Sequence, residues 1–256
     1  MAVKSGDVIN FLEQVAPIEL AEYWDNPGLQ VGSGEKAVKR ILVCLDVTSA
    51  SVEEAISNSV DMIVTHHPLI FKELKRIVYG EGKGSLLFDL IRNGITVYSA
   101  HTNLDYAALG VNAHLAEALG LKDAARLGKG PGLAGELDSE LGLGDFITRI
   151  KKSLDVPFVR VVGKGKKQVK KAAVFCGSFD DDLECVIKSR ADVLVTGDLK
   201  YHTALDAREA GLCIIDAGHF NTEKIVLPAL AAAIKAKFPD VDTDYFKEEE
   251  DPFKTC

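Results

Sequence analysis

The sequence predicts an α/β protein with two similar β-α-β lobes and mostly parallel sheets. Short runs rich in Val, Ile and Leu alternate with helical patterns, and one part of the chain aligns with another. Near-continuous apolar strands separated by helices are typical of parallel strands that are buried on both faces. With 256 residues, 47% of them hydrophobic and 27% charged, the chain has the composition of a globular protein with a sizeable core.

The predicted elements follow one another in a regular order. An amphipathic pattern predicts a helix within residues 1–15. Seven runs predict strands, at residues 40–47, 61–66, 94–100, 158–163, 171–177, 192–197 and 212–218. Helical patterns lie between them, at residues 49–59, 85–93, 110–120, 180–190 and 202–211. Residues 222–239 predict one long helix, in which Pro228 is tolerable only as a kink.

A glycine-rich stretch, residues 128–144, interrupts this order. We interpret it as a junction between a first lobe, residues 1–127, and a second lobe, residues 145–256. An internal repeat supports two related lobes, because residues 38–67 align without gaps on residues 169–198, a shift of 131 positions.

The repeat continues into the next strand of each lobe. After one inserted glycine, the pattern His-x-Asn-x-Asp at residues 101–105 aligns with His-x-Asn-x-Glu at residues 219–223. The two lobes are therefore expected to place their strand ends, and the residues beyond them, in comparable positions.

Several classes of protein are excluded or disfavoured. The net charge of −8 counts against general binding of nucleic acid. We expect no membrane helix and no secretory signal, because the chain has neither a long apolar stretch nor an apolar segment at its start. The five cysteines form no C-x-x-C pair, which is typical of reduced thiols in a cytoplasmic protein. The P-loop, the G-x-G-x-x-G fingerprint after a strand and the G-x-S-x-G elbow are all missing.

Side chains that bind metals follow four of the predicted strands. They are His66 with His67, His101 with Asp105, Asp198 with His202, and His219 with Glu223. In open α/β sheets, functional groups collect beyond the carboxyl ends of the strands. One histidine at a strand end is more often a surface residue than a ligand, but four such ends in two repeats favour a metal site. Imidazole and carboxylate donors suit Zn²⁺, Mn²⁺, Fe²⁺, Co²⁺ or Ni²⁺, and these residues leave open whether one ion or two are bound.

Three further residues have weaker signals. His114 lies in a helical pattern with no metal-binding residue type beside it, so we interpret it as structural. Lys200 and Tyr201 either face a substrate or simply begin a helix.

The segments VTHHPLIF, SAHTNLD, TGDLKYH and GHFNTE, with WDNPGLQVG near the start, resemble the Nif-three-like dinuclear metal-centre family. Members of this family are commonly labelled type 2 homologues of GTP cyclohydrolase 1. The resemblance covers the whole chain, and it indicates the short form without an inserted domain. It implies two metal ions per chain, in a cleft between two similar lobes. The implied ligands are His66, His67, Asp105, His219 and Glu223.

The resemblance also bears on assembly and chemistry. It implies a ring-shaped hexamer, a trimer of dimers, and it places His101 and His202 in the same cavity, where we expect a role in substrate binding or proton transfer. A metal-dependent hydrolase that uses a metal-bridging hydroxide on GTP, another nucleotide or a phosphoester is the function we expect. The alternative is a protein that handles metal or serves as a scaffold, with little catalysis.

Overall fold

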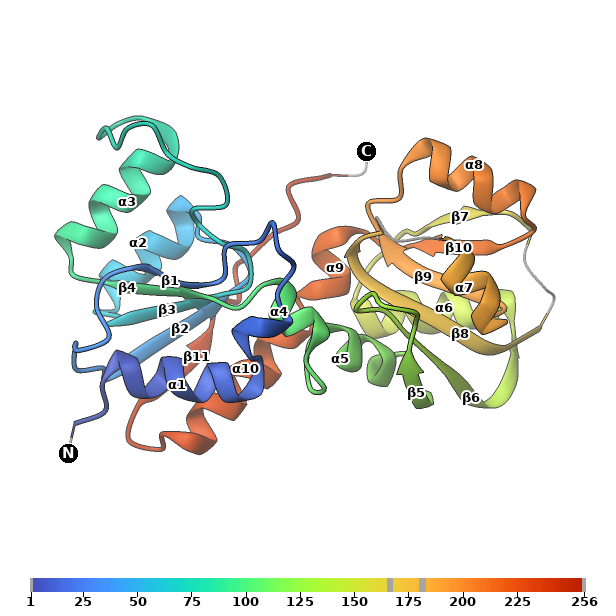
Figure 1. Cartoon of the computed structure of the whole chain (residues 1–256), viewed down its shortest axis with the longest axis horizontal. Helices are drawn as coiled ribbons and strands as arrows, with labels where there is room; N and C mark the ends of the chain where they lie inside the picture. The colour runs from blue at the N-terminus through green and yellow to red at the C-terminus, as the bar shows by residue number, and fades with distance from the viewer. Residues whose placement is uncertain (1, 165–167, 180–182, 255–256) are drawn as a thin grey trace. The chain divides into compact units, whose positions relative to one another are not determined.

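The computed structural model describes residues 2–164, 168–179 and 183–254, and the chain forms two compact units (Figure 1). The first unit comprises residues 1–107 and 227–256, and the second comprises residues 108–226. Within the described part of the chain, no helix has both the length and the apolar character needed to cross a membrane.

The first unit is built on a five-stranded sheet with the strand order β1-β4-β3-β2-β11. Its strands are β1 (Gly28–Val31), β2 (Arg40–Cys44), β3 (Met62–Thr65), β4 (Thr96–Ser99) and β11 (Asp242–Tyr245). All neighbours pair in parallel except β1, which is antiparallel to β4. Both β3 and β4 are buried along their whole length, as expected for central strands that are covered on both faces.

Helices cover both faces of this sheet. They are α1 (Ser5–Val15), α2 (Ser49–Ser57), α3 (Gly82–Arg92), the short α4 (Thr102–Tyr106) and α10 (Val226–Lys237), with a 3₁₀ turn at Ile18–Leu20. Figure 1 shows α2 and α3 above the sheet and α1 and α10 below it. The rings of Phe11 and Phe238 meet edge to face, with centroids 5.9 Å apart, which ties α1 to the chain just after α10.

The second unit contains a six-stranded sheet with the strand order β5-β6-β8-β9-β10-β7. Its strands are β5 (Leu121–Arg126), β6 (Leu133–Gly142), β7 (Arg160–Val162), β8 (Gln168–Ser178), β9 (Val193–Gly197) and β10 (Cys213–Asp216). Only β8, β9 and β10 pair in parallel, so this sheet is mixed where the sequence predicted a mostly parallel one. At one edge of the sheet, the short connection between β5 and β6 explains the antiparallel pairing. Parallel strands need a much longer crossover connection.

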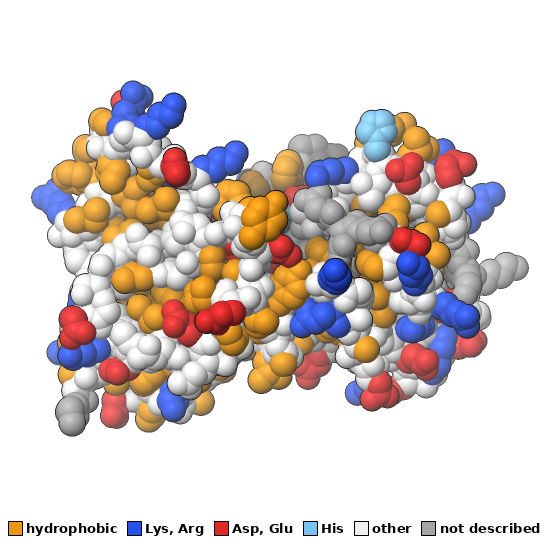
Figure 2. Space-filling view, in the orientation of Figure 1, with side chains coloured by type: hydrophobic (Ala, Val, Ile, Leu, Met, Phe, Trp, Pro, Cys, Tyr) orange, Lys and Arg blue, Asp and Glu red, His pale blue; other side chains and the backbone are white. Residues whose placement is uncertain are grey.

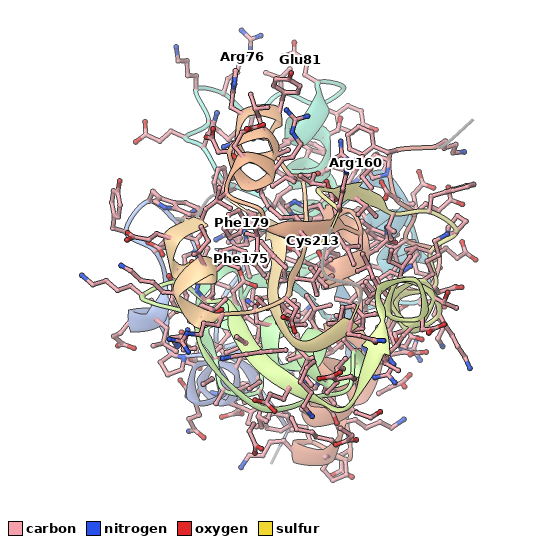
Figure 3. All side chains as sticks on the ribbon, turned by 90° about the vertical axis from the view of Figure 1, so that its right-hand side faces the viewer. Arg76, Glu81, Arg160, Phe175, Phe179 and Cys213 are labelled. Atoms are coloured by element: carbon pink, nitrogen blue, oxygen red, sulfur yellow. The ribbon has the colours of Figure 1, made fainter. Side chains whose placement is uncertain are left out.

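The helices of the second unit are α5 (Val111–Ala118), α6 (Leu143–Leu154), α7 (Leu183–Ser189), α8 (Tyr201–Glu209) and α9 (His219–Glu223). A buried apolar cluster fills the space beside the sheet, and it includes Phe179, Leu194 and Ile214. Phe175 and Phe179 lie side by side in this region, edge to face with ring centroids 5.2 Å apart (Figure 3).

The internal repeat is confirmed by the register of the strands. Ile41 of β2 lies opposite Met62 of β3, and Ala172 of β8 lies opposite Val193 of β9. Both residues of the second pair follow those of the first by 131 positions, which is the shift seen in the sequence. In each unit the next parallel strand, β4 or β10, also carries an antiparallel edge strand, β1 or β7. The order and direction of β1, β4, β3 and β2 are therefore repeated by β7, β10, β9 and β8.

All seven predicted strands are present, but the predicted long helix is interrupted. It forms α9 and α10, with a break between residues 223 and 226. Pro228 is the third residue of α10, where the missing backbone N–H has no helical partner to lose, so it starts a helix instead of bending one.

The glycine-rich stretch that the sequence suggested as a junction contains strand β6. One of its glycines, Gly135, allows close pairing of β6 with β5. A Cβ atom on Gly135 would lie 2.6 Å from the carbonyl oxygen of Lys122 on β5. The chain passes from the first unit to the second earlier, between residues 107 and 108, and it returns to the first unit between residues 226 and 227.

This close approach makes Gly135 sensitive to substitution. We expect Gly135→Ala to lower the free energy of unfolding by about 1–3 kcal/mol, because backbone atoms of β5 would have to move. Gly144→Ala is the matched control, since a Cβ atom on this helical glycine meets nothing within 4 Å. Urea unfolding of both variants measures the difference, and equal stabilities would contradict the account of β6.

Candidate metal centre

Three histidines of the first unit lie at the carboxyl ends of neighbouring parallel strands. His66 and His67 follow β3 directly, and His101 follows β4 and precedes the first residue of α4. The backbone N–H groups of His66 and His67 donate to the carbonyl oxygens of Cys44 and Leu45, at 3.2 and 2.9 Å. These bonds extend the pairing of β3 with β2 by two residues. They fix the backbone positions from which the two imidazole side chains project.

The three imidazoles form one cluster. The ring centroids of His66 and His67 are 4.9 Å apart, and those of His101 lie 5.2 and 5.4 Å from them. One nitrogen of each ring can be chosen so that all three lie within 4.8 Å of one another. Such a group of nitrogen donors could hold a metal ion.

The histidines at these strand ends share one hydrogen-bonding pattern, which also includes His219 of the second unit. In each ring, Nδ1 lies within hydrogen-bonding distance of an oxygen that can only accept. The partners are the carbonyl of Ala100 for His66 (2.8 Å), Asp46 for His67 (3.0 Å), Asp25 for His101 (2.7 Å) and Asp198 for His219 (2.9 Å). A proton held on Nδ1 leaves the lone pair on Nε2, which is the usual state of an imidazole that binds a metal.

A carboxylate accompanies a histidine in each unit. In the second unit, His219 and Glu223 stand four residues apart on α9, and Nε2 of His219 lies 3.1 Å from Oε2 of Glu223. In the first unit, Nε2 of His66 lies 3.6 Å from Oδ1 of Asp105 on α4. Two donor atoms that each bind the same ion at about 2 Å lie about 3 Å from one another. The distance within each pair therefore fits two ligands of one cation.

Two glycines make room for the second pair. Gly177 has a φ of +60°, and a Cβ atom there would clash with the carboxylate of Glu223. A Cβ atom on Gly197 would lie 2.5 Å from the backbone nitrogen of His219. Thr222 adds a further constraint, because its hydroxyl accepts the N–H of Gly177 at 3.0 Å. The buried position of Glu223 therefore depends on the absence of side chains at two neighbouring strand ends.

The structure brings His66, His67, His101 and Asp105 together in the first unit, and His219 with Glu223 in the second. His202 differs from them. It lies in the first turn of α8 with an exposed side chain, and its ring contacts that of Tyr201, with centroids 5.4 Å apart. Its predicted role in substrate binding or proton transfer stays a prediction.

Sequence reasoning missed two supporting carboxylates, Asp25 and Asp46, and it grouped Asp198 with the metal donors although Asp198 contacts Nδ1 of His219. Asp46 had a usable signal, because it directly follows the strand run RILVCL. Asp25 lies in the segment WDNPGLQVG, which carries part of the family resemblance.

Asp25 is a buried carboxyl with a lowered pKa. Its side chain is fully buried, and the backbone N–H of Thr102 donates to it at 3.0 Å, together with the Thr102 hydroxyl. Burial alone would raise the pKa of Asp25, but the hydrogen bonds from His101 and Thr102 outweigh burial and lower it to about 2. Asp25 is therefore a permanent anion at neutral pH, suited to holding the Nδ1 proton of His101.

Comparison with known proteins identifies relatives over nearly the whole chain. Residues 3–252 match the family described as Duf34/NIF3 (NGG1p interacting factor 3). A Clostridium perfringens protein named "GTP cyclohydrolase 1 type 2 homolog" is 38% identical over 260 residues, which covers 98% of this chain and 99% of that protein.

Solved structures agree with this match. The Bacillus cereus protein related to NIF3 has a TM-score of 0.94 at 28% identity, covering 100% of this chain and 99% of that one. The Staphylococcus aureus hypothetical protein SA1388 has a TM-score of 0.92 at 29% identity, with both chains fully covered.

The lowered pKa of Asp25 predicts a pH-dependent contribution to stability. Because the folded-state pKa lies below the unfolded value, this contribution is complete above about pH 4 and is lost as the pH falls toward 2. We expect Asp25→Asn to be less stable than the wild type by about 2 kcal/mol at pH 7, and by less at pH 3.

Urea unfolding of the metal-free proteins at the two pH values measures this difference. Asp138→Asn, a substitution at an exposed aspartate, is the control and should have little effect at either pH. An Asp25→Asn deficit of the same size at pH 7 and pH 3 would contradict the proposed ionisation.

Proposed function

Because the chain belongs to the Duf34/NIF3 family, we propose that it binds two divalent metal ions and hydrolyses a nucleotide or a phosphoester. The observation that supports the proposal most is the common state of the site histidines, each with Nδ1 held by an acceptor and Nε2 left as a donor for a cation. In a cluster of surface histidines without a function, nothing would require an oxygen acceptor at the Nδ1 of every ring.

We assign the metal ligands as the resemblance implies. They are His66, His67 and Asp105 of the first unit and His219 and Glu223 of the second. The described donor groups combine imidazole nitrogen and carboxylate oxygen, a set that accepts Zn²⁺, Fe²⁺, Mn²⁺, Co²⁺ or Ni²⁺ and follows metal availability as much as intrinsic preference.

The chemistry divides between the ions and the chain. When bound, divalent ions supply an acidified water and a Lewis acid for an oxygen of the substrate. We assign His101 the task of taking a proton from the attacking water at Nε2 and returning it to the leaving group. The contact of its Nδ1 with Asp25 supports this role, because Asp25 would stabilise the imidazolium. Water adds its oxygen to the substrate, and the leaving group departs with the returned proton.

GTP is the first substrate to test, because relatives carry the name GTP cyclohydrolase 1 type 2 or its homolog. Other nucleotides and simple phosphoesters belong in the same panel, since a shared fold does not fix the substrate. The ring-shaped hexamer stays a prediction. Exposed apolar side chains of α3 and the loop before it, including Ile77, Phe88 and Ile91, provide a surface that assembly could cover (Figure 2).

The test combines metal content with turnover. Metal-reconstituted wild type should hold about two ions per chain and hydrolyse at least one member of the panel. We expect His66→Ala to lose bound metal and to reduce turnover by about 100-fold or more, because it removes a buried donor. His114→Ala removes an imidazole from α5 and should leave both quantities unchanged.

Two outcomes would change the assignment. Full metal content in His66→Ala would contradict the proposed ligands. Two bound ions without turnover on any substrate would favour the alternative, a protein that handles metal or acts as a scaffold.

A further inference from the structure

The side chain of Glu249, in the segment after β11, contacts the backbone just beyond the end of β2. β11 pairs with β2, and the N–H of Phe246 extends this pairing with a hydrogen bond to Val43 at 2.7 Å. Beyond that point the Glu249 carboxylate accepts the N–H of Leu45, at 2.8 and 3.0 Å, and the N–H of Asp46, at 2.7 Å. The side chain thus takes the place of a neighbouring strand for two backbone amides.

The same two residues hold His67. The carbonyl of Leu45 accepts the backbone N–H of His67 at 2.9 Å, and Oδ1 of Asp46 lies 3.0 Å from Nδ1 of its ring. Both the backbone and the imidazole of His67 therefore depend on the segment that Glu249 binds. Glu249 reaches this segment across 204 positions of the sequence, so the link exists only in the folded chain.

The second repeat meets the same structural need with neutral groups. The residue equivalent to Leu45 is Cys176, whose N–H donates to the side-chain oxygen of Asn112 at 2.9 Å. The next N–H, that of Gly177, donates to the hydroxyl of Thr222. An amide or a hydroxyl is therefore sufficient to satisfy these backbone groups.

A carboxylate at the first site carries a cost that neutral acceptors avoid. Burial raises the pKa of Glu249, and the nearby charge of Asp46 raises it further, while the two backbone hydrogen bonds and His67 act in the opposite direction. The repeats also differ at the second of the two bonded residues. The first segment has Asp46 there, with a histidine ring to orient, and the second has Gly177, which has no side chain.

We propose that Glu249 is a positioning residue for His67: it fixes Leu45 and Asp46 so that Asp46 holds the Nδ1 proton of His67 and Nε2 faces a cation. The orientation of the ring stands on the contacts above, whereas its effect on metal binding rests on the proposed function. Loss of Glu249 should free the segment after β2, allow His67 to exchange tautomers and weaken the binding of the ion that His67 holds.

The first readout needs no metal. Nitrogen-15 NMR of the imidazoles in the metal-free protein reports which ring nitrogen carries the proton. The wild type should show the Nδ1–H form for His67, Glu249→Ala should show a mixture of both forms, and Glu249→Gln should keep the Nδ1–H form because its amide oxygen still accepts the two backbone hydrogen bonds. Glu250→Ala removes the same charge from the adjacent, exposed position and should match the wild type.

The second readout is calorimetric titration with Zn²⁺. We expect Glu249→Ala to weaken one of the binding events by about 10–100-fold, as is typical when a group that supports a metal ligand is lost. Asp46→Asn should weaken the same event, and the double variant should be no weaker than the worse single variant, because both act through His67.

The outcomes separate the two proposals. An unchanged His67 tautomer in Glu249→Ala, or a Glu250→Ala variant with the same defect, would overturn the positioning role. Absence of Zn²⁺ binding by the wild type would contradict the proposed function and leave the NMR test valid. If Glu249→Ala does not fold, Glu249→Asp takes its place in the NMR test. Its shorter side chain should not reach both backbone N–H groups, so a mixture of His67 tautomers is expected, and an unchanged Nδ1–H form would overturn the positioning role.

Discussion

The candidate site depends on the hydrogen bonds that the Nδ1–H groups of four histidines donate to oxygen acceptors; the histidines are His66, His67, His101 and His219. An imidazole that can rotate or change tautomer presents either nitrogen, and a cation then has no fixed donor. Here an oxygen acceptor at Nδ1 removes that freedom. The strand that ends shortly before each histidine fixes the position of its backbone. Supporting carboxylates, glycine positions and the terminal segment can each be understood as ways to keep these bonds in place.

The repeated architecture explains how one chain obtains several such positions. Parallel strands end at the same edge of a sheet, so residues that follow β3 and β4 in the first unit must lie near one another. The same register in the second unit puts Asp198 and His219 at the corresponding ends of β9 and β10. The repeats then diverge in chemistry. The position of His67 is occupied by an aspartate in the second unit, where Asp198 supports an imidazole instead of offering one.

Much of this arrangement could be predicted from the sequence, because apolar runs and repeated histidine motifs are local signals. The strands that were missed lack those signals. β6 carries acidic residues and glycines and resembles a linker, while the short β1 and β11 gain their identity from pairing with strands far away in the sequence. Helical periodicity also could not locate the break between α9 and α10, since α9 is set by its packing against β8 and β9.

The supporting groups were the hardest part of the site to foresee. Asp25 meets His101 across 76 positions, and Glu249 reaches Leu45 across 204. A motif search registers residues that are close in sequence, and it has no means of assigning such a partner. Only the tertiary fold shows that these carboxylates lie beside the histidines or beside the residues that hold them. It also shows that the segment after β11 takes part in the same hydrogen bonds.

The most direct test of the proposed metal centre is the position of bound metal in crystals grown with Zn²⁺ or Mn²⁺, located by anomalous scattering. We expect metal peaks about 2 Å from Nε2 of His66, His67 and His219, with each Nδ1 still bound to its oxygen acceptor. Metal bound through Nδ1, or peaks confined to other residues, would contradict the proposed centre.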